Sequence, residues 1–459
     1  MPRARTAGKK AATESSDFEE WCQQEFNPAA AFSKPEVLKG YRVLSCTQYI
    51  LGPSCAAYLG ELGAEVIKIE QPRTGEPMRH TTPWNEPLLY PLSRWVPERG
   101  TGLGFFGANY NEYFVGLDFH RPEARELMLK LAAKADVVVE NYRPGTFDRW
   151  GVGYRQLKEV NPRLVYAWLG GFGGWGHGRG RASYDILGQA QGGAFGITGW
   201  QEEFGGFPSK HTIWLADYWG GMMQAVNILA ALYWRDTVSG EGTFLEYSQV
   251  DGVTRQLEWS LPVYGRYGVV RQRWGGWDTE LCVNGIIGCG KSSYPDSDNP
   301  QEQEQGFITI TAYQDEDFAR LCDVIGRQDL AKKYPDLDSR VVADSQREIY
   351  AALEEWAKDK TKEEVASILD KSDILNQPVW NAKEVAEQPH WRERGSIGWL
   401  DDPTFGDVLA QGPGYNLSET PPRVRSAFKP VGADNGFIYA KLAGLSNEEI
   451  QQLEEEEVI

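Results

Sequence analysis

Residues 42–70 read RVLSCTQYILGPSCAAYLGELGAEVIKIE, and this stretch decides the fold class. The short apolar run at 42–45 and the longer run at 64–70 are expected to form strands. Between them, apolar residues recur at helical spacing over 54–62, and Gly63 follows as a stop signal. A strand–helix–strand unit of about thirty residues holds its two strands parallel, joined by a right-handed crossover. The stretch therefore predicts a layered α/β domain.

The same alternation continues further along the chain. Residues 121–135 have the pattern of an amphipathic helix, and 136–141 and 163–170 are continuous apolar runs. Continuous runs are typical of parallel strands that are buried on both faces. We predict a doubly wound, Rossmann-like parallel sheet, which binds its ligand beyond the carboxyl ends of its strands. The loops after residues 45, 70, 141 and 170 are the expected site.

A second domain is expected after about residue 265, where a loop-rich stretch leads into a strand at 306–312 and then into helical patterns. We read this region as a smaller α+β domain. The predicted organisation is a flexible tail over 1–37, a large α/β domain over 38–250, the small domain over 265–375, and a segment over 376–459 that returns to the large domain.

Composition excludes several classes of protein. The 459 residues carry 47 Lys and Arg against 65 Asp and Glu, a formal net charge of −18, which argues against nucleic acid or an anionic membrane surface as the main partner. The six cysteines form no CxxC pair and the five histidines no ligand spacing, so we expect no metal site, and free thiols in a reducing, cytoplasmic setting. The apolar segment 218–234 contains Gln and Asn and predicts a buried helix, not a membrane span. The basic first ten residues lack an apolar core, so we expect no secretory signal.

A glycine-rich motif, GFGGWG, occupies residues 171–176 and matches GxGxxG literally. In a dinucleotide site this motif opens a helix directly and is followed by an acidic residue at a strand end. Here the next helical pattern starts only near Ser183 and no such acid follows. We therefore expect a loop over the ligand-binding edge of the sheet and no nicotinamide cofactor.

Two carboxylates stand out by their context. Asp185 begins a helical pattern after the glycine-rich loop, and Asp217 opens the apolar helix in the segment WLADYWGG. An Asp at a helix N-terminus is commonly a cap. A poorly hydrated carboxylate in a dry cleft is alternatively a nucleophile toward an activated acyl group. These residues alone leave both interpretations open.

Four segments together carry a family resemblance: YRVLSCTQYILGPSCAAYLGELGAEVIKIEQPRTGEPMR, VVVENYRPGTFDRWGVG, SYDILGQAQGG and WLADYWGGMMQAVN. In this order they resemble the class III coenzyme A transferases, the family of formyl-CoA:oxalate CoA-transferase, carnitine CoA-transferase and α-methylacyl-CoA racemase. The resemblance covers about residues 38–450. It implies an enzyme that moves CoA from an acyl-CoA to a carboxylic acid, with no permanently bound cofactor. It also implies two interlocked chains, as a homodimer or as a hetero-oligomer with a homologous subunit.

The resemblance also implies roles for individual residues. Asp217 stands at the position of the nucleophile, which forms aspartyl mixed-anhydride and aspartyl-CoA thioester intermediates. The racemase branch has a His where this chain has Tyr184, so Tyr184 and Asp185 are expected to shape the pocket, and transfer is favoured over racemisation. Some members have an Arg where this chain has Gln71, so the phosphate contact is expected to shift to Arg73 or Arg79. A covering glycine loop is expected at Gly275 and Gly276 or at Gly288 and Gly290. The full set of implied CoA contacts is Tyr49, Ile50, Leu51, Gln71, Arg73, Arg79, Leu117, His120, Asn141, Tyr142 and Arg149.

Aromatic residues suggest the substrate class. The stretch 80–113 is rich in aromatic residues and Pro, and Trp274 and Trp277 follow in the second domain. Rings near a pocket favour a bulky or aromatic acid, such as an aryl- or alkylsuccinate with succinyl-CoA as donor. Packing or a subunit interface explains the same rings equally well. The alternative functions are a racemase-like isomerase and a CoA-binding subunit of a hetero-oligomeric transferase.

Overall fold

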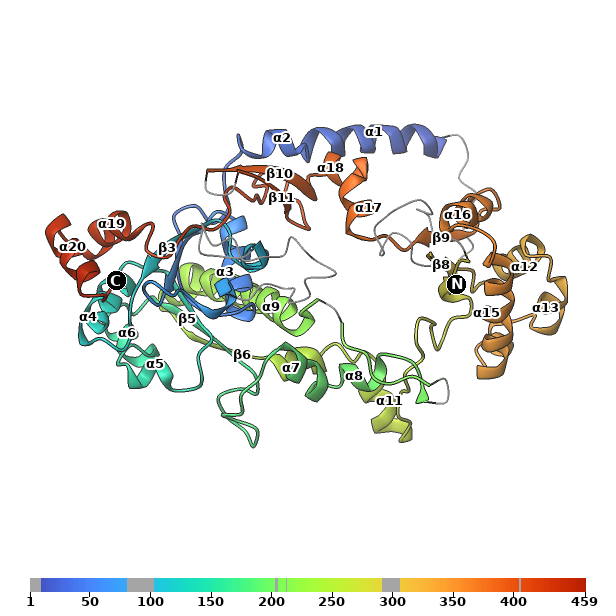
Figure 1. Cartoon of the computed structure of the whole chain (residues 1–459), viewed down its shortest axis with the longest axis horizontal. Coiled ribbons are helices and arrows are strands. Elements are labelled where there is room, and N and C mark those ends of the chain that lie inside the picture. Colours follow the sequence, from blue (N-terminus) through green and yellow to red (C-terminus); the bar gives the residue numbers. More distant parts are fainter. Residues whose placement is uncertain (1–9, 81–102, 203–204, 212, 291–305, 404–405) are drawn as a thin grey trace. The chain divides into compact units, whose positions relative to one another are not determined.

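The chain folds into two compact units in the computed structural model (Figure 1), which describes residues 10–80, 103–202, 205–211, 213–290, 306–403 and 406–459. The first unit comprises Met1–Ala194, His211–Glu258 and Gln388–Ile459, and the second comprises Phe195–Lys210 and Trp259–Glu387. These limits differ from the boundaries at 250, 265 and 376 that the sequence suggests, because 195–210 packs with the second unit and the chain returns only at 388. None of the described helices combines the length and the apolar character needed to cross a bilayer.

The first unit is built on a parallel sheet, which confirms the predicted fold class. Its described strands are β1 (Arg42–Cys46), β2 (Glu65–Glu70), β3 (Glu112–Gly116), β4 (Val137–Glu140), β5 (Val165–Gly170) and β6 (Phe244–Ser248). Their order in the sheet is β3-β2-β1-β4-β5-β6, the doubly wound order. The four strands that the sequence predicts are all present, and the sequence pattern does not predict the two edge strands β3 and β6.

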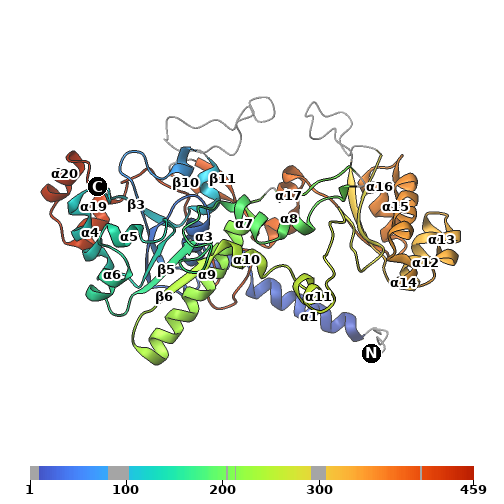
Figure 2. The same cartoon turned by 90° about the horizontal axis from the view of Figure 1, so that it is seen from below.

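Helices cover both faces of this sheet (Figures 1 and 2). On one face pack α4 (Pro122–Ala132), α5 (Thr146–Arg149) and α6 (Tyr154–Val160), together with the C-terminal end of the chain. On the other face pack α3 (Leu51–Glu61) and α9 (Leu215–Trp234). Successive strand residues alternate between these two cores, which is why the strands read as continuous apolar runs.

The second unit contains an antiparallel sheet, as expected for an α+β domain. Its described strands are β7 (Asn284–Gly288), β8 (Phe307–Thr311) and β9 (Leu375–Pro378), in that order. Helices α12 (Asp315–Val324), α15 (Ala343–Ala357) and α16 (Lys362–Asp370) supply buried apolar residues to the core beside this sheet.

The remaining elements are mostly short. Residues 1–37, expected to be a flexible tail, contain two helices in their described part. The other elements are α1 (Lys10–Glu25), α2 (Pro28–Ala31), η1 (Pro77–His80), η3 (Leu103–Ala108), α7 (Asp185–Gln191), α8 (Ala194–Ile197), η5 (Arg235–Ser239), α10 (Gln249–Thr254), α11 (Ser260–Tyr267), α13 (Gln328–Lys333), α14 (Leu337–Arg340), α17 (Ala382–Glu387), α18 (Pro389–Glu393), β10 (Ile397–Asp402), β11 (Gly406–Gln411), α19 (Asn435–Ile438), η6 (Tyr439–Ala443) and α20 (Asn447–Glu455).

Helix α9 approaches α3 so closely that glycine is required at the contact. A Cβ placed on Gly221 would lie 2.1 Å from Ser54 Oγ and 2.9 Å from the backbone nitrogen of Cys55. A Cβ on the preceding Gly220 would lie 2.5 Å from Leu51 Cδ1. Gly221 therefore lets the backbones of α3 and α9 meet without a side chain between them, and Gly220 makes room for the Leu51 side chain.

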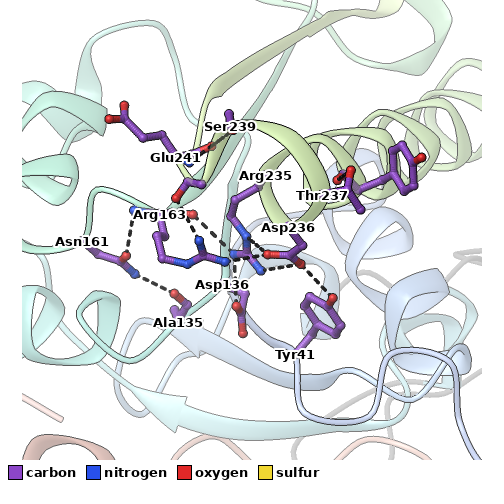
Figure 3. A network of polar contacts seen from close by, with 12 residues as sticks. Tyr41, Ala135, Asp136, Asn161, Arg163, Arg235, Asp236, Thr237, Ser239 and Glu241 are labelled. Carbon is purple, nitrogen blue, oxygen red and sulfur yellow. Dashed lines mark hydrogen bonds and ion pairs between the residues drawn. The ribbon is translucent and has the colours of Figure 1, made fainter.

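A charged network fixes the C-terminal end of α9 (Figure 3). The Arg235 side chain, almost fully buried, pairs with Asp136 at 3.0 Å and with Asp236 at 2.8 Å. Asp236 also accepts hydrogen bonds from Tyr41 Oη at 2.8 Å and from Arg163 Nη2 at 2.6 Å. Tyr41, Asp136 and Arg163 stand just before β1, β4 and β5. The end of α9 is thus tied to the amino edge of the sheet, and its first turn points toward the carboxyl edge.

The contact at Gly221 gives a test of this packing. Gly221→Ala will lower the free energy of unfolding by about 1–3 kcal/mol, because the added methyl group collides with backbone as well as with a side chain. Gly265→Ala, in exposed α11 with nothing within 4 Å of the new Cβ, will instead raise it by up to about 1 kcal/mol. Urea unfolding of both variants measures the difference. Equal shifts in the same direction would contradict the packing argument.

Candidate functional site

A cavity of about 400 Å³ lies at the carboxyl edge of the parallel sheet. It is bordered by the loops after β1, β4 and β5 and by the first residue of α10, which follows β6. Strands β1 and β4 are neighbours at the point where the strand order reverses, where doubly wound sheets bind ligands. Three of the four expected loops border this cavity, and the loop after residue 70 does not. The lining consists of residues 48, 49, 51, 141–144, 146, 168–173, 180–184, 217 and 249.

Asp217 lines this cavity from the first turn of α9 and is only 7% exposed. Its Oδ1 accepts a hydrogen bond from Gln249 Nε2. Burial, and then the nearby carboxylate of Asp185, raise the pKa of Asp217 to about 7, against the opposing effect of the Gln249 hydrogen bond. At neutral pH the carboxylate is therefore present in a large fraction of molecules, yet it is weakly hydrated.

Asp185 is the cap of α9, although it belongs to another helix. Its Oδ1 accepts from the backbone nitrogens of Ala216 at 2.8 Å and Asp217 at 3.3 Å. Its Oδ2 accepts from Gln189 Nε2 at 2.6 Å. Asp185 therefore occupies the amides at the start of α9 and fixes the backbone from which Asp217 projects. Of the two interpretations that the sequence left open, the cap applies to Asp185.

Hydrogen bonds join the loops after β1 and β4. The Gln48 backbone nitrogen donates to Asn141 Oδ1 at 2.8 Å, and Asn141 Nδ2 donates to the Gln48 carbonyl at 2.8 Å. Gln48 Nε2 donates to Tyr142 Oη at 3.0 Å. The predicted contact residues Asn141 and Tyr142 thus line the cavity and also hold its rim together.

Tyr49 and Tyr184 form one wall of the cavity. Their rings meet edge to face with centroids 5.3 Å apart. The hydrogen bond with Tyr184, and then burial, raise the pKa of Tyr49 to about 12. Tyr184 is 56% exposed and immediately precedes Asp185. Tyr184, predicted to shape the pocket, and Tyr49, predicted to contact CoA, thus both line the cavity.

The other predicted CoA contacts are distributed unevenly. Leu51 lines the cavity, Ile50 is buried beside it, and Arg149 donates to Thr146, a lining residue, at 2.9 Å. The residues near the ends of β2 and β3 lie outside the lining. Gln71 is exposed, Arg73 pairs with Glu457 at 2.5 Å, Leu117 belongs to the core, and His120 is exposed beside Asp118.

Arg79 has a different position from the one expected. It is 1% exposed, its Nε and Nη2 donate to the two oxygens of Glu70 at 2.6 Å, and it lies over the ring of Phe105. The structure therefore does not offer its guanidinium group to a ligand phosphate, and the exposed Arg73 is left as the predicted contact.

The expected glycine loop and tryptophans lie in the second unit. The Gly275 nitrogen donates to the Gly199 carbonyl, and Gly276 precedes Trp277. Gly288 ends β7, and the Gly290 nitrogen donates to the Ala357 carbonyl. Trp277 stacks on Tyr350 with centroids 4.2 Å apart, and Trp274 Nε1 donates to Gln346 at 2.9 Å. These tryptophans therefore have packing roles within their own unit. The residues 81–102 of the aromatic stretch lie outside the described residues.

Among the lining residues that sequence reasoning did not single out are Gln249, Arg143 and Arg181. The available signal for Gln249 was its place directly after a strand, in EYSQVDG. In the described part of the chain no histidine lines the cavity, and no three His, Cys, Asp or Glu side chains are grouped as a metal would require.

A doubly wound sheet with a buried carboxylate at its switch point defines an α/β enzyme site. The family model described as CoA-transferase family III matches residues 38–435 of the chain. The chain belongs to this family and is a CoA-transferase, which confirms the resemblance seen in its motifs.

Curated relatives and solved structures agree with the family. The succinyl-CoA–D-citramalate CoA-transferase of Chloroflexus aurantiacus is 29% identical over 93% of this chain and 98% of its own length. The alpha subunit of the succinyl-CoA–L-malate CoA-transferase from the same organism is 28% identical over 92% of both chains, and the beta subunit is 28% identical over 92% of this chain and 98% of its own. A CAIB/BAIF family protein from Brucella suis superimposes with a TM-score of 0.75 at 25% identity, covering 89% of this chain and 100% of that one.

The raised pKa of Asp217 predicts a pH-dependent gain in stability for Asp217→Asn. The pKa of the Asp217 carboxyl is about 3.9 in the unfolded chain and about 7 in the folded protein. Between these two pH values the folded wild type retains a proton that the unfolded chain has lost. Wild-type stability therefore falls relative to the variant as pH rises, by at most about 1.4 kcal/mol per pH unit. Urea unfolding at several pH values will show that the difference in unfolding free energy between Asp217→Asn and wild type grows up to about pH 7. Above about pH 8 this difference stays nearly constant. Asp251→Asn, at an exposed carboxylate of α10, serves as the control. A gain in Asp217→Asn that does not change with pH would contradict the assignment.

Proposed function

We propose that the chain transfers CoA from an acyl-CoA thioester to a carboxylic acid, with Asp217 as the nucleophile. The observation that carries this proposal is the buried carboxylate of Asp217, held by Gln249 inside a cavity at the switch point of the sheet. A desolvated carboxylate on a fixed backbone is a competent nucleophile toward an activated acyl group.

The proposed reaction has two symmetric halves. Asp217 attacks the donor thioester carbonyl, which forms a mixed anhydride and releases CoA as thiolate. The thiolate attacks the aspartyl carbonyl, so that an aspartyl-CoA thioester forms and the donor acid leaves. The acceptor carboxylate then attacks the aspartyl thioester, forms a second anhydride and releases the thiolate again. The thiolate attacks the acceptor carbonyl, which yields the new acyl-CoA and restores the Asp217 carboxylate.

The site geometry suits these steps. Each intermediate is an activated carbonyl that water hydrolyses, so the reaction needs a site with little water. Asp217 is 7% exposed, and Asp185 holds its backbone by accepting from two amides of α9. The thiolate has to return to the same aspartyl carbonyl, and a fixed backbone keeps this carbonyl in place between the two attacks.

Transfer fits the site better than isomerisation. Racemisation next to a thioester requires a pair of groups, one that removes the α-proton and one that returns it, with pKa values near the working pH. Asp217 can supply one of them. The position held by a His in the racemase branch is Tyr184 here, and the pKa of its partner Tyr49 is raised to about 12. Within the described lining of the cavity no histidine is available to replace it.

The proposed donor is succinyl-CoA, and the proposed acceptor is a dicarboxylic acid. The two related Chloroflexus aurantiacus transferases are named for succinyl-CoA, with D-citramalate or L-malate as the second acid. Arg143 and Arg181 belong to the lining that contains Asp217, and Arg181 Cζ lies 4.6 Å from the ring centroid of Phe172. A cation there can bind the carboxylate of the acceptor that does not react. Alkyl- and arylsuccinates belong to this class, and the walls formed by Tyr142, Trp168 and Phe172 suit an apolar substituent.

We also propose the setting in which the enzyme works. Coenzyme A thioesters act as substrates, and no cofactor needs to stay bound. The working form is a homodimer or a pair with a homologous subunit, as in the L-malate enzyme with its alpha and beta subunits. All six cysteines are free thiols, which fits a reducing, cytoplasmic setting.

Trapping of the intermediate tests the nucleophile. Incubation with succinyl-CoA, acetyl-CoA or another acyl-CoA, followed by hydroxylamine and peptide mass spectrometry, will place a hydroxamate on Asp217. The adduct requires donor and is absent from Asp217→Asn, whereas the control Asp251→Asn still forms it.

Other outcomes would redirect the assignment. An unmodified Asp217 together with exchange of the α-proton of a 2-methylacyl-CoA would replace transfer by isomerisation. Neither adduct nor exchange in the isolated chain, with an adduct restored by a homologous subunit, would identify the chain as one subunit of a hetero-oligomeric transferase.

Arg181→Gln tests the acceptor class. We expect KM for a dicarboxylic acceptor to rise about tenfold, because a charge-assisted contact is lost, while KM for acetyl-CoA as donor and for a monocarboxylic acceptor, neither of which has a second carboxylate, stays within about twofold. Arg179→Gln changes an exposed arginine of the same loop outside the lining and serves as the control. A rise in KM for acetyl-CoA instead would assign the guanidinium group to the phosphates of CoA.

A further inference from the structure

A buried cluster of charges lies behind the Tyr49 wall of the cavity. It consists of Lys68, Glu70, Glu76, Arg79 and Glu112, none of which is more than 3% exposed. Burying charges is costly unless each has a partner of opposite sign or a set of hydrogen bonds. The contacts inside this cluster therefore show which residue balances the charge of each member.

Arg79 and Glu70 form the tightest pair, with Nε and Nη2 each donating to a different carboxylate oxygen at 2.6 Å. Glu112 is enclosed, and burial raises its pKa to about 8, so it is mainly protonated at neutral pH. Lys68, which is fully buried, has Glu76 Oε1 at 4.0 Å and Thr47 Oγ1 at 3.4 Å. Glu76 is therefore the carboxylate that balances Lys68.

The second oxygen of Glu76 reaches the cavity wall. Glu76 Oε2 accepts from the backbone nitrogen of Tyr49 at 3.0 Å and from that of Met78 at 2.9 Å. The Glu76 nitrogen in turn donates to Glu70 Oε2 at 3.0 Å, which fixes the loop that carries Glu76. A single buried carboxylate thus joins the loop after β2 to the loop after β1.

Tyr49 needs such a contact because of its backbone conformation. Its φ angle is +61°, in the left-handed region, which is unfavourable for a residue with a Cβ. Strained backbone of this kind persists where surrounding contacts determine it. The ring of Tyr49, which lines the cavity and meets the ring of Tyr184, takes its direction from this backbone.

We propose that Glu76 is a positioning residue of the transferase: its carboxylate holds Tyr49 in the left-handed conformation from behind the cavity, and Lys68 supplies the buried counter-charge. This inference rests on the proposed function, because it assigns Glu76 to the wall that acyl-CoA contacts. Glu76 itself does not line the cavity and acts through the Tyr49 backbone. Its loss will therefore change acyl-CoA binding more than the chemical steps at Asp217.

Two double variants separate this role from simple charge balance. K68M/E76Q and K68M/E76M both neutralise the Lys68–Glu76 pair, so neither leaves an unpaired buried charge. The amide oxygen of Gln at position 76 can still accept from the Tyr49 nitrogen, whereas the Met side chain cannot. We expect KM for succinyl-CoA to stay within about threefold of wild type in K68M/E76Q and to rise about tenfold or more in K68M/E76M, with kcat changed less than KM in both.

Equal KM values in the two double variants would overturn the inference, because charge balance alone would then explain Glu76. If K68M/E76M does not fold, K68M/E76A takes its place, because Ala also lacks an acceptor for the Tyr49 nitrogen and is smaller than Met. A KM for succinyl-CoA that is raised in K68M/E76A relative to K68M/E76Q supports the role, while equal values overturn it. The trapping of Asp217 in wild-type protein is measured first. If no adduct forms on Asp217, the proposed function is wrong. If the adduct forms but the double variants have equal KM values, only the role of Glu76 is wrong.

Discussion

The close contact between α3 and α9 at Gly220 and Gly221 is the constraint on which the site depends. Gly221 leaves no side chain between the two backbones, and Gly220 makes room for Leu51, so α9 lies against the core on one face of the sheet. The last turn of α9 is tied to the amino edge through Arg235, and its first turn is directed to the carboxyl edge. Asp217 sits in that first turn, three residues before Gly220. Any side chain at the contact would displace the helix and, with it, the carboxylate. The position of the Asp217 carboxylate therefore depends on glycine at positions 220 and 221.

The two acidic residues of the site divide two tasks that a single carboxylate could not perform together. Asp185 accepts hydrogen bonds from the backbone nitrogens of Ala216 and Asp217 and thereby fixes the start of α9. Asp217 keeps its carboxylate toward the cavity, where burial and the neighbouring acid raise its pKa to about 7. An ionised Asp217 is consequently unfavourable for the stability of the folded state at neutral pH. This is the expected situation of a residue kept for reactivity, and it is why the same substitution is predicted to remove transfer and to stabilise the fold.

Much of the fold could be predicted from the sequence, because strands buried on both faces appear as uninterrupted apolar runs, as at 136–141 and 163–170. Strand β6 was missed since it lies at a sheet edge and is only partly buried, whereas β3 was missed although it is largely buried. For the site, local context singled out Asp185 and Asp217. Gln249 reaches Asp217 only because β6 pairs with β5, and the enclosure of Arg79 depends on Glu70 and Phe105, so no local pattern signals either fact.

The central claim is that the acid exchanged during transfer passes through Asp217. The most direct measurement follows a heavy-oxygen isotope from a labelled acceptor carboxylate during turnover with succinyl-CoA. If the acceptor forms an anhydride with Asp217 before CoA joins it, one labelled oxygen remains on the aspartate, and peptide mass spectrometry will find it in Asp217. Formation of the labelled acyl-CoA product with no heavy oxygen in Asp217, or with the label in another residue, would contradict the account.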